Sequence, residues 1–379
     1  MFNRLQILRS SGNESCFLWG PRQTGKSTLL KHLYPSSHYY DLLFSEEFER
    51  LTKKPSLLRE EILAMEPHGP IIVDEVQKIP RLLDEIQWLI VNKNISFILC
   101  GSSARKLKRS GANLLGGRAL RYELFPFVSK EIPNFNLSRA LNNGLLPRHY
   151  LANDPAPLIR AYIGDYLKEE IAAEALTRNV PAFAKFLEIA ALSNGEIVNY
   201  TNIASECGVS SVTAKEYFQI LCDTLVGCFM PSYIKRPKRR VIHAPKFYFF
   251  DVGITNVLLK RGEIVPGTEY FGRALEHLVM QEIKAHSHYS GIEYPISYWR
   301  SASGLEVDFI LGDHQTAVEV KSTSEVQERH IRGISAFRDD YKPKRSIVVS
   351  MDRRKRIMGN IEIMPVMEFL EELWDGKLM

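Results

Sequence analysis

Residues 20–28, GPRQTGKST, bring two glycines, a lysine and three hydroxyl side chains together and contain the spacing G-x-x-x-x-G-K-[ST]. The apolar run CFLWG leads into this stretch and the helical pattern LLKHL follows it, so we expect a strand, a loop and a helix. Gly20 and Gly25 let backbone N–H groups point at phosphate oxygens. The N-terminus of the following helix, which is the positive end of its dipole, also faces the phosphates. The pattern therefore predicts a site for the phosphates of a nucleotide.

The side chains of this loop predict ATP with Mg²⁺ as the ligand. We expect Lys26 to contact the β- and γ-phosphates, Ser27 to bind Mg²⁺ and Thr28 to lie beside the α-phosphate. The whole loop is predicted to line the nucleotide: Gly20, Pro21, Arg22, Gln23, Thr24, Gly25, Lys26, Ser27 and Thr28. A glycine turn with a chance lysine is the alternative, but the four fixed positions and the flanking patterns disfavour it.

A second apolar strand, GPIIVDEVQ at residues 69–77, ends in two carboxylates. We expect Asp74 to hold Mg²⁺ through water and Glu75 to polarise the attacking water, the two tasks that phosphoryl transfer to water requires. A third strand, ISFILCGSS, ends in Ser102 and Ser103. Ser102 is predicted to lie between the phosphate loop and the Asp74–Glu75 pair and to sense the γ-phosphate. A serine that only satisfies a turn is the alternative.

Three arginines follow the third strand: Arg105, Arg118 and Arg121. An arginine in this part of an ATPase can act as a finger that reaches the nucleotide of a neighbouring subunit. Most arginines, however, are solvated or paired on the surface. The residues alone therefore leave open which of the three, if any, is a finger.

A separate group of charged residues lies in GLEVDFILGDHQTAVEVKST, near the C-terminal end. Two apolar-alternating runs flank a polar turn, and this predicts two paired strands that bring Asp308, Glu319 and Lys321 together. The same alternation predicts Val307 and Phe309 on one face of the first strand and Asp308 on the other. The expected element order around this hairpin is helix, three strands, helix.

These residue types are the set that a metal-dependent nuclease needs. Asp308 and Glu319 are predicted to bind Mg²⁺ near a scissile phosphate, and Lys321 to stabilise the attacking hydroxide or the pentacovalent phosphorus. Glu276, in the helical stretch GRALEHLVMQEIKAH, is predicted to complete the acidic set. Two alternatives remain, a cross-strand salt bridge in an ordinary hairpin and a domain that holds DNA or protein without cutting it.

The middle of the chain predicts a helix-turn-helix. The runs FAKFLEIAALS and NYTNIASECGVSSVTAKEYFQILCDTLVG give three helical patterns, with CGVS as the turn between the last two. Ser210 or Ser211 would cap the last helix, which would present Ser211, Thr213 and Lys215 to a DNA groove. Two strands then flank the basic KRPKRR (235–240), the layout of a winged helix whose wing contacts phosphates. A module that serves only for packing or protein contact is the alternative.

Length and composition are those of a folded protein with more than one domain. A chain of 379 residues predicts two or three domains, and 45% hydrophobic with 25% charged residues is typical of globular proteins. Five cysteines without a CxxC spacing suit a reducing compartment and disfavour structural zinc. The start MFNRLQILRS has no apolar signal core, and no run of eighteen apolar residues occurs, so we expect a cytoplasmic protein without a membrane partner.

The chain resembles the AAA+ ATPases in GPRQTGKST, IIVDEVQ, ILCGSSARKL, LLGGRALRYELFPF, PKFYFFDVGI and EVDFIL…VEVKS, and within them the bacterial and archaeal family with a C-terminal domain of poorly known function. The C-terminal motif, Asp-x(10)-Glu-x-Lys after a helical glutamate, resembles the PD-(D/E)XK nucleases. The resemblance implies an α/β protein with a P-loop AAA+ ATPase domain (1–130), a helical lid and winged-helix domain (131–265) and a restriction-endonuclease-like α/β domain (266–379). It also implies that Arg118, which matches an arginine close to the subunit junction of relatives, is the finger in a homo-oligomer.

We therefore expect an enzyme that hydrolyses ATP with Mg²⁺ and acts on DNA, with DNA endonuclease activity left open. The alternative is a switch in which ATP controls binding to a protein partner and the nuclease-like domain is not catalytic. A small-molecule kinase would share the phosphate loop. It is disfavoured because Asp74 and Glu75 match activation of water better than binding of a substrate hydroxyl.

Overall fold

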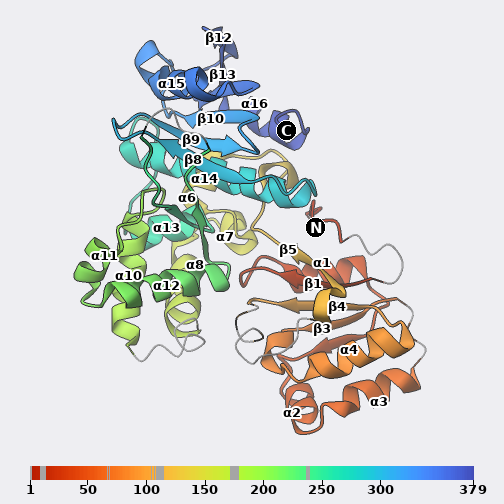
Figure 1. Ribbon diagram of the computed structural model, residues 1–379. Coiled ribbons are helices and arrows are strands. Elements are labelled where there is room, and N and C mark those ends of the chain that lie inside the picture. The colour runs from red at the N-terminus through yellow and green to blue at the C-terminus, as the bar shows by residue number, and fades with distance from the viewer. Residues whose placement is uncertain are drawn as a thin grey trace. The chain divides into compact units, whose positions relative to one another are not determined.

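The structure, a computed structural model, has two compact units. It describes residues 2–8, 14–65, 67, 69–103, 105, 107, 115–170, 179–235 and 240–379, without the side chains of residues 168–170. The N-terminal unit consists of residues 3–125 and 223–226, and the C-terminal unit of residues 126–222 and 227–379 with Phe2 (Figure 1). The three-domain division expected from the sequence, with boundaries at 130/131 and 265/266, stays a prediction.

A five-stranded sheet in the order β2-β3-β4-β1-β5 forms the centre of the N-terminal unit. Every neighbouring pair in it is parallel. The strands are β1 (Ser15–Trp19), β2 (Tyr39–Asp41), β3 (Ile71–Asp74), β4 (Phe97–Gly101) and β5 (Ala119–Glu123). Because β4 lies between β1 and β3, the carboxyl ends of these three strands meet at one edge, where open parallel sheets bind ligands.

Helices cover this sheet because its central strands are apolar on both faces. The helices are α1 (Lys26–Leu33), α2 (Ser45–Lys53), α3 (Ser56–Ala64) and α4 (Leu82–Lys93), with 3-10 turns η1 (Val76–Lys78) and η2 (Leu115–Gly117). One core cluster joins Leu51 of α2, Leu58 of α3 and Leu89 of α4 to Phe17 and Leu99 of the sheet. Three helices therefore pack on the same face.

A short segment from much later in the chain completes the N-terminal unit. The guanidinium of Arg105 lies 2.6 Å from the carboxylate of Asp223, and the Ser103 hydroxyl donates to the Asp223 carbonyl oxygen at 3.1 Å. Leu225 packs against the core described above, and Val226 is fully buried. The N-terminal unit is therefore not a continuous stretch of the sequence.

Asp223→Ala is expected to lower the free energy of unfolding of the N-terminal unit by about 1 to 3 kcal/mol, because it leaves the largely buried Arg105 without its carboxylate. The side chains of the pair are 17% and 22% exposed. Amide hydrogen exchange of β4 would measure the change. Lys54→Ala is the matched control, since it breaks a pair in the same unit that is 56% and 48% exposed. Equal protection in both variants would contradict the expectation.

The first part of the C-terminal unit is mostly helical. Its elements in chain order are η3 (Ser129–Glu131), α6 (Leu137–Asn143), α7 (Pro147–Leu151), α8 (Ala156–Ala161), the π-helix η4 (Tyr162–Glu170), α10 (Val180–Leu192), α11 (Tyr200–Cys207), α12 (Ser211–Asp223), β6 (Gly227–Met230), β7 (Lys246–Phe249) and α13 (Val252–Leu258). The last residue of α12, Asp223, belongs to the N-terminal unit.

The three helical patterns predicted in the middle of the chain are confirmed as α10, α11 and α12. Gly208 ends α11 with φ of 69°, and the Ser210 hydroxyl accepts the Thr213 N–H at 3.1 Å, which caps α12. The two predicted strands are β6 and β7, which pair antiparallel. Residues 236–239 of the basic stretch between them lie outside the described residues.

A six-stranded sheet in the order β12-β13-β11-β10-β9-β8 follows. The strands of this sheet and the helices around it are, in chain order, α14 (Glu269–Tyr289), β8 (Ile296–Arg300), β9 (Glu306–Leu311), β10 (Thr316–Val320), η5 (Glu328–Ile331), α15 (Arg332–Tyr341), β11 (Arg345–Ser350), β12 (Arg356–Met358), β13 (Ile361–Pro365) and α16 (Val366–Trp374). The predicted order of helix, three strands and helix is therefore present. No helix in the described ranges has the length and apolarity to cross a membrane.

The predicted alternation along β9 is wrong at one point. Val307 packs in the core cluster that contains Phe337 of α15, whereas Phe309 packs in the other cluster, with Leu278 of α14. A strict period of two would have placed both on one face. The sheet is irregular nearby, since the register between β8 and β9 shifts between Ser297 and Trp299. A bulge of this kind changes the face on which side chains lie.

Candidate functional site

The phosphate loop lies between β1 and α1, as the sequence predicted. Gly25 adopts φ of 94° at the start of α1, a conformation that only glycine adopts without strain. A Cβ on Gly20 would lie 2.5 Å from the Leu124 carbonyl oxygen, so this position also requires glycine. The Lys26 ammonium donates to the carbonyl oxygens of Gly20 and Pro21 at 2.8 and 3.0 Å. The lysine therefore already lies within the loop.

The other loop residues differ in exposure. Thr24 is buried, and its hydroxyl donates to the Pro21 carbonyl oxygen at 3.0 Å. Arg22 and Ser27 are half-buried, and Gln23 and Thr28 are exposed. Which of them contact a nucleotide stays a prediction.

The end of β3 lies beside this loop. The Ser27 hydroxyl donates to Oδ2 of Asp74 at 2.6 Å, and the Tyr39 hydroxyl donates to the same oxygen. The other oxygen, Oδ1, accepts the Glu75 N–H at 3.0 Å. A hydroxyl and a carboxylate in contact at the start of α1 are the oxygen ligands that Mg²⁺ prefers, so these residues fit the ion that the sequence predicted.

Glu75 is buried and has φ of 57°, which is uncommon for a residue with a side chain. The Gln77 side-chain amide donates to Oε2 of Glu75 and, at 3.2 Å, to the hydroxyl of Ser102. Gln77 thus connects the ends of β3 and β4, since Ser102 directly follows β4. The role of Ser102 as a sensor of the γ-phosphate stays a prediction. The sequence analysis missed Gln77, although it stands only two residues after Glu75.

Gln77→Ala is expected to lower kcat for ATP hydrolysis about tenfold with KM little changed, because Glu75 loses the amide that orients it before reaction. Steady-state phosphate release at saturating and limiting ATP would separate kcat from KM. Gln87→Ala on α4 is the matched control. An unchanged or higher kcat in the Gln77 variant would show that this amide does not position the glutamate for catalysis.

The three arginines are in different environments. Arg105 is paired with Asp223, which disfavours it as a finger. Arg118 is exposed on the turn before β5, where its backbone N–H donates to the Leu115 carbonyl oxygen at 3.0 Å, and Arg121 is exposed on β5. Both exposed arginines are free to reach another molecule, and the choice of Arg118 as finger stays a prediction.

A second group of charged residues lies in the C-terminal unit. Asp308 and Glu319 are 6% and 5% exposed, and Lys321 forms an ion pair with Glu319. The Val320 N–H donates to Oδ2 of Asp308 at 2.7 Å, which ties β10 to β9 at this point. The structure therefore brings the three predicted residues together.

Burial dominates the electrostatics of this group. Burial, and after it the carboxylates of Glu319 and Glu276, raise the pKa of Asp308 well above its usual value. Burial also raises the pKa of Glu319, although Lys321 opposes the shift. Burial lowers the pKa of Lys321, but Glu319 and Asp308 outweigh it and leave that pKa above its usual value. Buried carboxylates of this kind gain from an added positive charge.

One fully buried oxygen of this group, on Glu319, has no hydrogen-bond partner. Oε2 of Glu319 is buried and accepts no hydrogen bond, although Oε1 of the same carboxylate is paired with Lys321. An orphaned buried oxygen requires an explanation, and a bound cation supplies one. Within the described ranges no three or more His, Cys, Asp or Glu side chains are arranged to hold a metal ion. The fit to a cation therefore rests on two carboxylates, Asp308 and Glu319.

Glu276 of α14 also lies at this group, but other residues hold it. Its Oε1 accepts the Tyr248 hydroxyl at 2.6 Å and lies 3.5 Å from the Lys246 ammonium. Lys246 is 3% exposed and lies 2.5 Å from Oε1 of Glu306, whose other oxygen lies 3.3 Å from Arg300. The sequence analysis missed Lys246 and Tyr248, which belong to β7 and stand far from the motif in the sequence.

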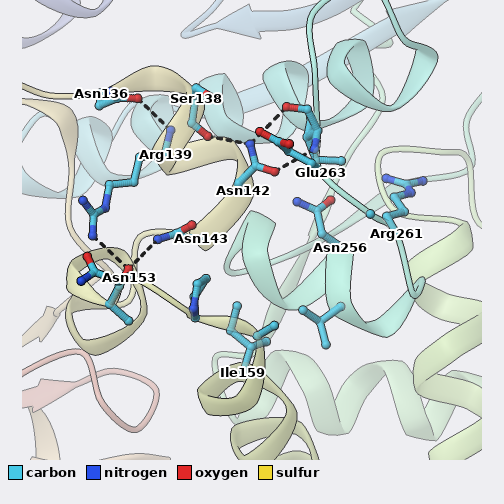
Figure 2. A pocket seen from close by; sticks show the side chains of 16 residues that line it. Asn136, Ser138, Arg139, Asn142, Asn143, Asn153, Ile159, Asn256, Arg261 and Glu263 are labelled. Atoms are coloured by element: carbon cyan, nitrogen blue, oxygen red, sulfur yellow. Dashed lines mark hydrogen bonds between the residues drawn. The ribbon is translucent and has the colours of Figure 1, made fainter.

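A cavity of about 690 Å³ lies elsewhere in the C-terminal unit, between α6, α8 and α13 (Figure 2). Several of its polar side chains bond the backbone of its own walls. The Asn142 side chain bonds both the N–H and the C=O of Ile264, at 2.7 and 3.1 Å, and Arg139 donates to the Ala152 carbonyl oxygen at 2.9 Å. None of the predicted site residues lines this cavity, so it is not the site predicted from the sequence.

Comparison with known families agrees with the N-terminal geometry. Residues 12–133 match a family described as "AAA domain". Residues 134–264 and 271–369 match two families that are each described as a domain of unknown function, DUF8612 and DUF4143. The parallel sheet, the phosphate loop and the first match together support an AAA ATPase domain.

Two relatives are named only as uncharacterized proteins. An uncharacterized protein of Mycobacterium tuberculosis is 25% identical over 317 residues, which cover 81% of this chain and 70% of the relative. An uncharacterized protein of Mycobacterium bovis matches with the same values. Among solved structures, the Aeropyrum pernix ORC1 protein in complex with DNA is 13% identical with a TM-score of 0.25, over 67% of this chain and 88% of that chain.

Proposed function

We propose, on the premise that residues 12–133 form an AAA domain, that this chain binds ATP with Mg²⁺ and hydrolyses it. The observation that carries this proposal is the contact of 2.6 Å between the Ser27 hydroxyl and Asp74, next to the loop that holds the Lys26 ammonium. Ser27 and Asp74 would hold Mg²⁺, which supplies positive charge for the β- and γ-phosphates. Lys26 would exchange its carbonyl partners for phosphate oxygens.

The remaining residues would act on the water and on the leaving group. Glu75 would accept the proton of the attacking water as the water oxygen bonds to the γ-phosphorus and the bond to the β–γ bridging oxygen breaks, which releases ADP. Gln77 would hold Glu75, and Ser102 would link it to the end of β4. Release of inorganic phosphate from ATP, with and without Mg²⁺, tests this function, and no release under either condition would contradict it.

A second function, Mg²⁺-dependent cleavage of DNA in the C-terminal unit, is favoured by the orphaned Oε2 of Glu319. Asp308 and Glu319 would hold the ion, which supplies Lewis acidity at the phosphate. Lys321 would stabilise negative charge on the phosphorus, and Glu276 would add to the field of the site. The order of elements from α14 to β11 supports a PD-(D/E)XK nuclease-like fold for this region.

The middle segment would bind the DNA on which the protein acts. The helices α10 to α12 and the antiparallel pair β6 and β7 support a winged helix, with α12 as the helix that enters a groove. Lys215 of α12 is exposed, and Lys235 begins the basic stretch between the two strands. Phosphate contacts by such residues would provide affinity without sequence specificity.

An ATP-controlled switch that binds a protein partner is the competing function, and it predicts no cleavage of any DNA. Cleavage assays on single-stranded, duplex and branched DNA, with and without ATP, separate the two. In either case the exposed Arg118 would act in trans if the chain forms a homo-oligomer. If Arg118 acts in trans, the rate of ATP hydrolysis per chain should rise with protein concentration, because association then completes the site.

A further inference from the structure

The carboxylate group of the C-terminal unit contains a lysine that the nuclease motif does not account for. Lys246 is 3% exposed, and its ammonium lies between Oε1 of Glu306 at 2.5 Å and Oε1 of Glu276 at 3.5 Å. It also lies 5.3 Å from the centroid of the Tyr298 ring, where a cation gains further stabilisation. A lysine so fully removed from water persists only when it is well paired.

The charges of this group nearly cancel. Four carboxylates, those of Glu276, Glu306, Asp308 and Glu319, face three cations, those of Lys246, Lys321 and Arg300. With every group ionised, one negative charge is left over. One divalent cation would make the site singly positive, which matches the single negative charge of a phosphodiester. Two divalent cations would leave three positive charges in a buried space.

The oxygen atoms of the four carboxylates are not equally available. Both oxygens of Glu306 face cations, and Oε1 of Glu276 accepts the Tyr248 hydroxyl and faces Lys246. By contrast, Oε2 of Glu319 has no partner, and Asp308 accepts one backbone N–H. The buried oxygen without a partner therefore lies on Glu319, next to Asp308, whereas Lys246 is paired with Glu276 and Glu306.

We infer that this site takes a single divalent cation, held by Asp308 and Glu319, and that Lys246 supplies the fixed positive charge that a second cation would otherwise supply between Glu276 and Glu306. The inference rests on the proposed cleavage function, because it assumes the metal site of that function. Lys246 is a positioning residue, since it is buried and acts through Glu276 and Glu306. Because the Lys246 ammonium is part of the chain, this positive charge is present at every metal concentration.

Titration with Mn²⁺, followed by the electron paramagnetic resonance signal of the free ion, counts the bound ions directly. The full chain is used without nucleotide and with Asp74→Asn, so that the ATP site does not contribute. Lys246→Met is expected to raise the count from one to two ions per chain. Lys246→Arg, which keeps the charge, and Lys355→Met, which removes another lysine paired with two glutamates, are expected to leave it at one.

Each result decides a different point. Two ions in the chain with the native Lys246 would overturn the inference and leave the proposed metal site standing, whereas no ion would overturn both. One ion with Lys246 and still one in the folded Lys246→Met variant would overturn the inference alone. Circular dichroism checks folding. If Lys246→Met does not fold, Lys246→Gln replaces it, and the count in the chain with native Lys246 keeps its meaning.

Discussion

Lys26→Ala is expected to reduce Mg²⁺-dependent ATP hydrolysis by about 10²-fold or more, as removal of a single preorganised donor to a developing charge commonly does. The ammonium already lies in the phosphate loop, where it donates to the carbonyl oxygens of Gly20 and Pro21, so ATP meets it without a large rearrangement. Alanine keeps the backbone that cradles the phosphates but removes the charge. Initial rates of phosphate release at saturating ATP would measure the loss.

The control for this variant is Lys93→Ala, at the exposed end of α4 in the same unit. It removes the same charge far from the loop in the sequence and is expected to leave the rate unchanged. The amide exchange of β1 and β4 should be alike in both variants, because neither lysine supports the core. Unchanged turnover in Lys26→Ala would remove the loop from the mechanism.

Asp308→Ala is expected to reduce Mg²⁺-dependent DNA cleavage about 10³-fold, to the level seen without the metal, because several kcal/mol of transition-state stabilisation depend on a correctly held ion. The variant is not expected to unfold the unit. Burial and neighbouring carboxylates raise the pKa of Asp308, so its ionised form is held at an energetic cost that alanine removes. Cleavage of labelled DNA and thermal unfolding, measured side by side, would separate the two effects.

Asp313→Ala is the matched control for cleavage. Asp313 belongs to the turn between β9 and β10 and its side chain is 55% exposed, paired with Lys235. Its loss should leave cleavage unchanged. If the unmodified chain cleaves no DNA at all, the variants cannot differ, and the ATP-controlled switch becomes the better account of the C-terminal unit.

The nucleotide site is the part of the molecule that local sequence predicted best. The loop and Asp74 stand in short motifs, and a parallel strand needs only its own apolar run to bring its end to the same edge as its neighbours. The same rule puts Ser102, which follows β4, at this edge. The helices α10 to α12 were also predictable, because their apolar spacing and the Gly208 turn are local signals.

Long-range contacts were not predictable in this way. Lys246 meets Glu306 across sixty positions of the sequence, and no periodicity marks a lysine before an aromatic run as a partner of a distant glutamate. The pairing of Arg105 with Asp223 is likewise invisible to local patterns. The predicted face of Val307 was wrong for a different reason. A strict period of two does not allow for an irregular register between neighbouring strands.

The segment 223–226 has a consequence for how the protein is made. A ribosome releases the chain in order, at about 5 to 20 residues per second. Roughly one hundred residues separate Phe125 from Asp223, so the N-terminal unit waits about 5 to 20 s for its last buried side chains. During that interval the partner of Arg105 and the cover that Leu225 and Val226 provide are still missing. The fold of the N-terminal unit is therefore completed only after most of the helical segment has been synthesised. Folding of the N-terminal unit thus depends on synthesis of part of the C-terminal unit.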